Sequence, residues 1–211
     1  MTADVAANYG SRMSRAPVMT ATGVPGPAGR PLFRACAPDT MALVDAQSGY
    51  VLEVVLENQM PDSADRTTSA LSAQNAARHF MTGIGMSTYG LAASVELVQQ
   101  AGVAAYSVTW RTRDALPETK FQVLVAASTG AVFAYLDLRM GMKLVAPIIG
   151  RTRALQLAMA SGGTNGPATS TDLWVKFAST GAQVSVWRMS SGVDVEVNAV
   201  TGETTATPPS R

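Results

Sequence analysis

Hydrophobic and polar residues alternate with a period of two along much of the chain, and this alternation is typical of half-buried β-strands. The clearest case is the segment VDVEVN at 193–198, in which every second residue up to position 197 is valine. The same pattern predicts further strands at 41–45, 50–56, 93–99, 103–112, 120–125, 131–138, 173–177, 183–187 and 203–207. Short turn sequences separate these segments, so the chain is expected to form antiparallel hairpins.

Two segments repeat their apolar residues at helical spacing instead. The first helix is expected over 69–82, with Thr68 or Ser69 as its N-cap and Gly83 with Gly85 at its end. Its apolar face is rich in alanine, which allows a helix to lie close against a sheet. The second helix is expected over 152–161, and a loop rich in glycine follows it.

The two halves of the chain share one order of elements: a helix, a meander of strands, a Thr-Gly turn and a last strand. Trp110 and Trp187 end similar strands and lie 77 positions apart, whereas the turn glycines Gly130 and Gly202 lie 72 positions apart. The difference falls where the first half has a longer polar loop, at 114–118. We therefore interpret the two halves as an internal repeat.

The predicted fold class is α+β, with tandem small domains that each pack one helix on an antiparallel β-meander. The expected divisions are a flexible or extended arm at 1–31, a partial unit or β-hairpin at 32–60, and complete units at 66–140 and 150–207. Gly49 supplies the positive φ of the turn in the partial unit.

Two connecting segments differ in composition from the units. The arm is built from Ala, Ser, Thr, Gly and Pro without a period, and it would become ordered by lying along a partner surface. The segment 144–149 is the apolar end of a linker, and we expect it to pack at an interface between neighbouring units.

Three turn sequences resemble the closing hairpin of the PepSY family, which typically reads apolar-x-Val-Asp-Ala-x-Thr-Gly-x-Val. Residues 43–51 are the closest, with Ser48 in place of threonine. Residues 123–132 lack the aspartate, and residues 195–203 carry Asn198 at its position. The alanine-rich helix followed by strands is also similar to this family, and the resemblance implies a PepSY-like, cystatin-like fold.

The PepSY resemblance also implies a function. Domains of this family occur in propeptides of thermolysin-type metalloproteases and in many extracytoplasmic bacterial proteins, where they bind or inhibit peptidases or serve as interaction modules. The implied function is non-catalytic protein binding outside the cytoplasm, with a peptidase or another extracytoplasmic protein as partner. Residues 1–10 do not read as a signal peptide, so the chain either stays inside the cell or is a mature or truncated form.

Composition narrows the classes of function further. Of the 211 residues, 47% are hydrophobic and 15% are charged, which favours a packed core over disorder. The net charge of +1 and the absence of a basic run argue against a nucleic-acid partner. The apolar stretch at 144–149 is far shorter than the roughly 20 residues of a transmembrane helix. The single cysteine, Cys36, excludes an internal disulfide and is interpreted as a small apolar residue.

Candidate catalytic and metal-binding residues are sparse. His79 is the single histidine and is expected to be partly exposed at the border of the apolar face of the first helix. No nucleophile-elbow or nucleotide-binding motif is present, and no motif supports a pair of Cys36 with His79. We therefore expect no enzyme activity, no cofactor and no metal site, and a hydrolase using His79 is the least favoured alternative. Asp62 and Asp65 form either a weak cation site or a solvated loop.

The remaining candidates lie on the surface. Alternation places Trp174 and Trp187 on the non-core faces of their strands, and Trp110 can differ from its counterpart. Exposed tryptophans either anchor a partner or cover a neighbouring domain, and both interpretations stay open. Asp194 and Glu196 share an outward face that keeps the sheet hydrated. A second functional hypothesis is a structural or accessory subunit of a larger assembly, whose arm and sheet edges dock onto neighbours.

Overall fold

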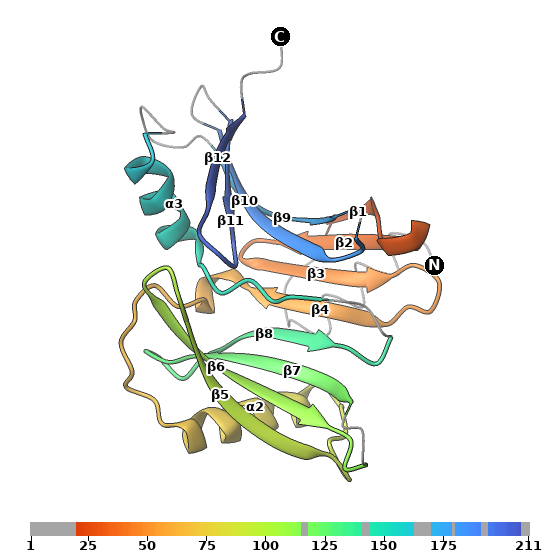
Figure 1. Cartoon of the computed structure of the whole chain (residues 1–211). Helices are drawn as coiled ribbons and strands as arrows, with labels where there is room; N and C mark the ends of the chain where they lie inside the picture. The colour runs from red at the N-terminus through yellow and green to blue at the C-terminus, as the bar shows by residue number, and fades with distance from the viewer. Residues whose placement is uncertain are drawn as a thin grey trace.

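The computed structural model describes residues 20–114, 118–140, 144–162, 170–178, 180–190 and 194–207. Within these ranges the chain forms twelve strands in two antiparallel sheets, together with two α-helices (Figure 1). The strands of the first sheet are β1 (Thr20–Pro25), β2 (Pro31–Ala37), β3 (Thr40–Asp45), β4 (Val51–Leu56), β5 (Ala92–Gln100), β6 (Val103–Arg111), β7 (Thr119–Ala126) and β8 (Val132–Asp137). The second sheet contains β9 (Ser170–Phe177), β10 (Gln183–Ser190), β11 (Asp194–Asn198) and β12 (Thr204–Thr207).

The helices are α2 (Ala70–Gly83) and α3 (Arg151–Ala160). Two short 3-10 turns, η1 (Pro27–Gly29) and η2 (Glu57–Gln59), lie in the connections around the first strands. The strand orders are β1-β2-β3-β4-β8-β7-β6-β5 and β12-β11-β10-β9. Strands that follow one another in the chain are neighbours in each sheet, except that β4 pairs with β8 instead of β5. The first sheet is therefore two four-stranded meanders that meet where β4 pairs with β8.

The junction of the two meanders has local two-fold symmetry. Val54 pairs with Tyr135 in antiparallel register, and each lies five residues after a turn glycine, Gly49 or Gly130. Equivalent positions that face each other across an antiparallel pair are related by a two-fold axis. β4 and β8 are thus equivalent last strands of their meanders, and their pairing joins the two meanders into one sheet.

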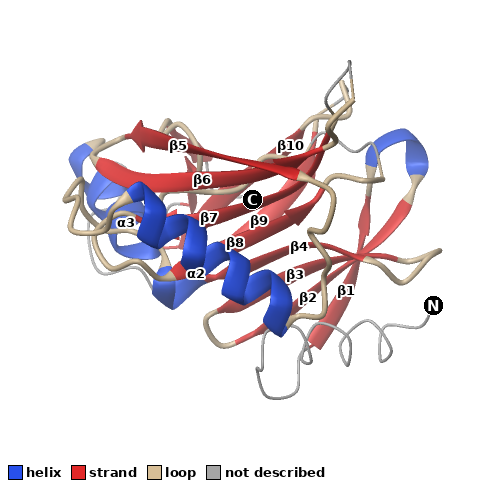
Figure 2. Ribbon diagram, turned by 90° about the horizontal axis from the view of Figure 1, so that it is seen from below, coloured by secondary structure: helices blue, strands red, loops and turns tan. Residues whose placement is uncertain are grey.

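The fold is layered, with the first sheet in the middle. The second sheet and α3 lie over one face of the first sheet, and α2 lies across the opposite face (Figures 1 and 2). Because successive side chains of a strand point to opposite faces, Tyr135 belongs to the core under α2, while Leu136 belongs to the core between the sheets. The first sheet is accordingly buried on both faces over much of its area.

The helix predicted over 69–82 is confirmed as α2. The Ser69 side chain accepts a hydrogen bond from the Ser72 backbone N–H at 3.1 Å and caps the first turn. Ala73, Ala77 and Met81 recur every four residues and are buried against the sheet. Two alanines on this stripe bring the helix backbone close to the strands.

One hydrogen-bonded turn occurs three times, at the hairpins β3–β4, β7–β8 and β11–β12. The glycines Gly49, Gly130 and Gly202 have φ values of +81°, +74° and +82°, and each glycine N–H donates to the carbonyl four residues earlier at 2.8–2.9 Å. In the first turn the Asp45 carboxylate accepts from two backbone N–H groups, and in the third the Asn198 side-chain oxygen does the same. This bonding explains why Asp and Asn occupy one position of the motif.

A second arrangement occurs at the start of each α-helix. The Tyr106 hydroxyl donates to the carbonyl of Thr68 at 3.0 Å, and the Trp187 indole N–H donates to the carbonyl of Ile149 at 2.6 Å. Each carbonyl lies two residues before its helix, so Tyr106 and Trp187 are structural equivalents. The pairing of Trp110 with Trp187 that the sequence suggested is therefore wrong.

The predicted fold class is also wrong. The described residues are predominantly antiparallel strands with two short helices, and they do not form a tandem of separate helix-on-meander domains. The segment expected to be a partial unit joins the neighbouring meander in a single eight-stranded sheet, because β4 pairs with β8. Within the expected arm, residues 20–25 form β1 and pair with β2, whereas residues 1–19 lie outside the described part of the chain.

The apolar linker, expected at an interface between neighbouring units, is buried between the two sheets. Leu144, Ala146, Ile148 and Ile149 are buried in the core between the two sheets. The N–H groups of Ile148 and Ile149 both donate to the carbonyl of Ala199 at 2.9 Å, which ties the linker to the second sheet. No helix among the described residues is long and apolar enough to cross a membrane.

Candidate functional site

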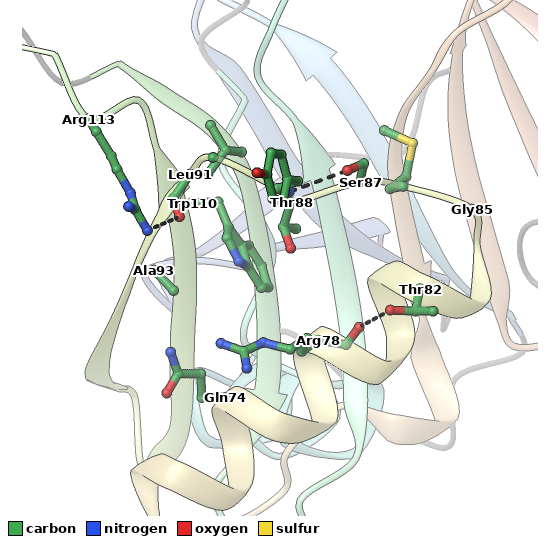
Figure 3. A pocket seen from close by; sticks show the side chains of 13 residues that line it. Gln74, Arg78, Thr82, Gly85, Ser87, Thr88, Leu91, Ala93, Trp110 and Arg113 are labelled. Atoms are coloured by element: carbon green, nitrogen blue, oxygen red, sulfur yellow. Dashed lines mark hydrogen bonds between the residues drawn. The ribbon is translucent and has the colours of Figure 1, made fainter.

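A surface cavity of about 930 Å³ lies beside α2, at the end of the first sheet where β5 begins (Figure 3). We call it the α2 groove. Its wall is formed by one face of α2, the loop at 85–91, the start of β5 and the end of β6. The lining residues are Gln74, Arg78, Thr82, Gly85, Met86, Ser87, Thr88, Tyr89, Gly90, Leu91, Ala93, Trp110 and Arg113.

The helical wall of the α2 groove is a polar stripe. Gln74, Arg78 and Thr82 are spaced four residues apart, so they lie on one face of α2, next to the buried alanine stripe. The Thr82 hydroxyl donates to the Arg78 carbonyl at 3.1 Å and is thereby held against the helix. The guanidinium of Arg78 is left as the longest charged group on this wall.

The loop at 85–91 forms a second wall of the groove, and backbone hydrogen bonds to α2 and within the loop hold it in place. The Met86 N–H donates to the Met81 carbonyl at 2.9 Å, and the Leu91 N–H donates to the Thr88 carbonyl at 3.2 Å. Gly85 and Gly90 have φ near +75°, which lets the loop turn sharply at both ends. Tyr89, at the rim, is 97% exposed and places an aromatic ring beside the opening.

Trp110 provides the aromatic surface of the groove. Its side chain is 2% exposed and belongs to the core under α2, yet part of it lines the cavity. Its cross-strand neighbours are Phe121 on β7 and Ala93 on β5. Because Ala93 has only a methyl side chain, the edge strand leaves space beside the indole.

Two cations face this space without an acidic partner. Among the described residues the guanidinium groups of Arg78 and Arg113 form no ion pair, and Arg113 donates only a long hydrogen bond of 3.5 Å to the Leu91 carbonyl. Figure 3 shows the guanidinium group of Arg113 on the side of Trp110 that faces Ala93, and the guanidinium group of Arg78 between Trp110 and α2. By contrast, Arg30, Arg139, Arg151 and Arg188 each pair with a carboxylate of the chain. The guanidinium groups of Arg78 and Arg113 are therefore available to bind an anionic group in the groove.

The three tryptophans predicted as a partner surface do not lie together. Trp187 is 0% exposed in the core between the sheets, so its predicted position on a non-core face is wrong. Trp174 is half-buried on β9, with the guanidinium carbons of Arg188 and Arg34 at 4.4 and 4.9 Å from its ring centre. These cation–π contacts use the indole within the molecule. A partner-binding role for Trp174 stays a prediction.

His79 and Cys36 are far from forming a catalytic pair. His79 is exposed on α2, and its side chain forms no hydrogen bond or ion pair with another described residue. Cys36 packs against the core between the sheets, on the face of the first sheet opposite α2. Burial raises the pKa of the Cys36 thiol, which disfavours the reactive thiolate.

The acidic candidates have local roles. Asp65 accepts a hydrogen bond from the Ser63 hydroxyl at 3.1 Å, and no group of three or more His, Cys, Asp or Glu residues in the described ranges is arranged to hold a metal ion. Glu196 pairs with Lys176 at 2.6 Å and with Arg188 at 2.9 Å. Asp194 is exposed at the start of β11.

A buried polar cluster lies between the sheets, and sequence reasoning missed it. Glu53 on β4 is 0% exposed, and one of its carboxyl oxygens accepts from the Gln183 amide at 2.7 Å. The same amide nitrogen donates to Ser185, and the Gln183 oxygen accepts from the Val145 N–H at 3.2 Å. Burial raises the pKa of Glu53 to about 8, so this side chain is mostly protonated at neutral pH. The visible signal was a lone glutamate inside the apolar segment VLEVVL.

Comparisons with known proteins give little further information. No family model and no curated protein matches the sequence. A similar solved structure is the Bacillus megaterium YpeB C-terminal domain, at 13% identity and a TM-score of 0.47 over 100% of this chain and 99% of that chain. Membership of the PepSY family therefore stays a prediction from the sequence.

Proposed function

We propose that this chain is a non-catalytic protein-binding module that takes up a segment of a partner protein in the α2 groove. The observation that carries the proposal is the pair of arginines, Arg78 and Arg113, that face a cavity beside Trp110 without an acidic partner in the described chain. Aromatic and arginine side chains are the types that dominate the energetics of protein–protein contacts.

The lining of the groove favours binding over catalysis. Its described lining residues include hydroxyl groups, from Thr82, Ser87 and Thr88, but no histidine, cysteine or carboxylate. A hydroxyl nucleophile needs a base within hydrogen-bond reach to attack a substrate. An amphipathic cavity with two cations that form no ion pair among the described residues can bind a ligand without such a base.

The PepSY resemblance supplies the class of partner. It implies a peptidase or another extracytoplasmic protein, which this chain would inhibit or regulate by occupying part of its surface. A cavity of about 930 Å³ is large enough for a few side chains of such a partner.

The proposal can be tested by filling the groove. Ala93→Trp places an indole in the cavity, whereas Ala92→Trp places it on the opposite face of β5 and serves as the matched control. A random peptide library displayed on phage is selected on the full chain. We expect the recovered peptides to bind the wild type and the control but not Ala93→Trp.

Two results would contradict the proposal. One is that the selected peptides bind Ala93→Trp as tightly as the control, or that none are recovered. The other is esterase or peptidase activity of the purified chain that His79→Ala abolishes, which would favour the hydrolase hypothesis.

A further inference from the structure

The strand beside the α2 groove has an outer edge that no described strand covers. β5 ends the first sheet, and no described strand pairs with its outer side. It has nine residues, against six in β1, eight in β9 and four in β12, the other edge strands. Its sequence contains no proline or lysine and carries one charge, Glu96. Edge strands of natural proteins are usually blocked by such residues, and an open edge of this length is a template for another strand.

The open edge and the groove meet at one residue. Ala93, the second residue of β5, lines the cavity and pairs with Trp110. The opposite end of β5 is covered in part, because Gln100 donates to the Thr201 carbonyl in the β11–β12 turn at 3.2 Å. A strand added along β5 would therefore pass the groove, and every second side chain would point to the groove side.

Resting on the proposed function, we infer that the partner segment is an extended strand that pairs with the free edge of β5 and places one Asp or Glu side chain between Arg78 and Arg113. The backbone hydrogen bonds of β-strand addition supply affinity without regard to sequence. The carboxylate supplies specificity, because each guanidinium can donate charge-assisted hydrogen bonds to it.

Charge also limits how acidic the segment can be. Glu96 lies three residues after Ala93, which is about 10 Å along a strand. Side chains alternate along a strand, so Glu96 points to the face opposite Ala93 and would repel an acidic side chain on that face. The segment therefore carries a single acid on the groove side, at the Ala93 end, rather than an acidic run. The neighbouring positions are neutral or basic.

The probes are three acetylated and amidated heptapeptides of β-forming residues: one with a central glutamate, one with glutamine in its place, and the glutamate peptide methylated at alternate backbone nitrogens. Binding to the full chain is measured by calorimetry. We expect the glutamate peptide to bind about tenfold tighter than the glutamine peptide, the loss expected for one charge-assisted hydrogen bond. The methylated peptide should lose binding, because it cannot pair with β5.

Matched variants assign the effect to the groove. Arg78→Gln and Arg113→Gln should each abolish most of the preference for glutamate, while Arg111→Gln, on an exposed arginine outside the groove, should leave it unchanged. Circular dichroism and urea unfolding check that each variant is folded. Hydrogen exchange should show slower exchange along β5 on binding of the glutamate peptide.

The outcomes separate this inference from the proposed function. Library peptides that bind at the groove without preference for an acid, or without protection of β5, would overturn the inference and leave the binding function standing. If free glutamate displaces the peptide at an equal concentration, the site binds a carboxylate without strand addition. That result would also overturn the inference. Failure of library and designed peptides alike would reject the binding function itself.

Discussion

The side-chain amide of Gln183 donates a 2.7 Å hydrogen bond to the carboxyl group of Glu53, across the space between the two sheets. Burial raises the pKa of Glu53, and this hydrogen bond lowers it in part. No charged group contributes to the shift. A carboxylic acid held in this way stabilises the packing of the sheets only while it keeps its proton.

The first prediction concerns pH. The pKa of Glu53 is about 8 in the folded chain against a reference of 4.5, so the unfolded chain loses this proton first as pH rises. The free energy of unfolding should therefore fall between about pH 4.5 and pH 8, by up to roughly 1.4 kcal/mol per pH unit, and level off above. Urea unfolding at several pH values measures this slope, with Glu53→Gln as the control. Equal slopes for the two proteins would contradict a protonated Glu53.

A second prediction concerns the partner of Glu53. Gln183→Leu leaves the carboxyl group buried without its donor and should lower the free energy of unfolding by about 1–3 kcal/mol. The double variant Glu53→Leu, Gln183→Leu should cost less than the sum of the two single changes, because it removes both polar groups. Urea unfolding of the four proteins at pH 6 gives the coupling energy. Strict additivity would mean that the contact contributes nothing to stability.

A third prediction tests the equivalence of Tyr106 and Trp187. Tyr106→Phe removes only the hydroxyl that bonds Thr68 and should cost about 0.5–1.5 kcal/mol. Trp187→Phe removes the equivalent bond to Ile149 and also leaves a cavity in the core, so it should cost more than Tyr106→Phe. Thermal or urea unfolding ranks the two variants. The reverse ranking would show that Trp187 is not a packed structural anchor.

A fourth prediction concerns the repeated turn. Desolvation raises the pKa of Asp45, but hydrogen bonds from Arg30 and Ser48 outweigh it and hold the pKa below its usual value. Asp45→Asn should keep the turn, because Asn198 makes the same backbone contacts in the third copy, and should lose only the ion pair with Arg30. Asp45→Ala loses both sets of bonds and should be the less stable variant by about 1 kcal/mol or more in urea unfolding at pH 7. Equal stabilities would mean that the turn does not need an acceptor at this position.

Local patterns predicted the helix α2 and the glycine turns because the responsible interactions lie within a few residues of sequence. The Ser69 cap and the alanine stripe are visible in the sequence of the helix itself. The junction of Val54 with Tyr135 is formed by backbone groups of segments 81 residues apart, and no side-chain pattern identifies such a partner. The eight-stranded sheet was missed for this reason.

The alternation of hydrophobic and polar residues predicted the wrong core face for β10, because both faces of that strand are partly buried. Val184 and Val186 suggested one core face, yet Ser185 and Trp187 are the residues that point to the first sheet. Ser185 is tolerated inside because its hydroxyl accepts a hydrogen bond from the Gln183 amide. A polar residue with a buried partner is thus mistaken for a surface residue when only hydropathy is considered.

The α2 groove was beyond sequence reasoning, although part of its wall was visible. Gln74, Arg78 and Thr82 form a regular polar stripe on the predicted helix, which reads as an ordinary hydrated face. Arg113 and Trp110 reach the same cavity only through the pairing of β5 with β6 and the packing of α2 on that sheet. The free charge of the arginines is a property of the folded arrangement.

The pairing of β4 with β8 has a consequence for how the chain matures during synthesis. Residues 51–56 emerge from the ribosome about 80 positions before residues 132–137, which complete their hydrogen bonds. For that interval the nascent chain carries an apolar strand with one side unpaired, a state prone to wrong association. The slow step of maturation should accordingly be the arrival of β8, and a chain cut before residue 132 should depend on chaperones far more than the whole protein does.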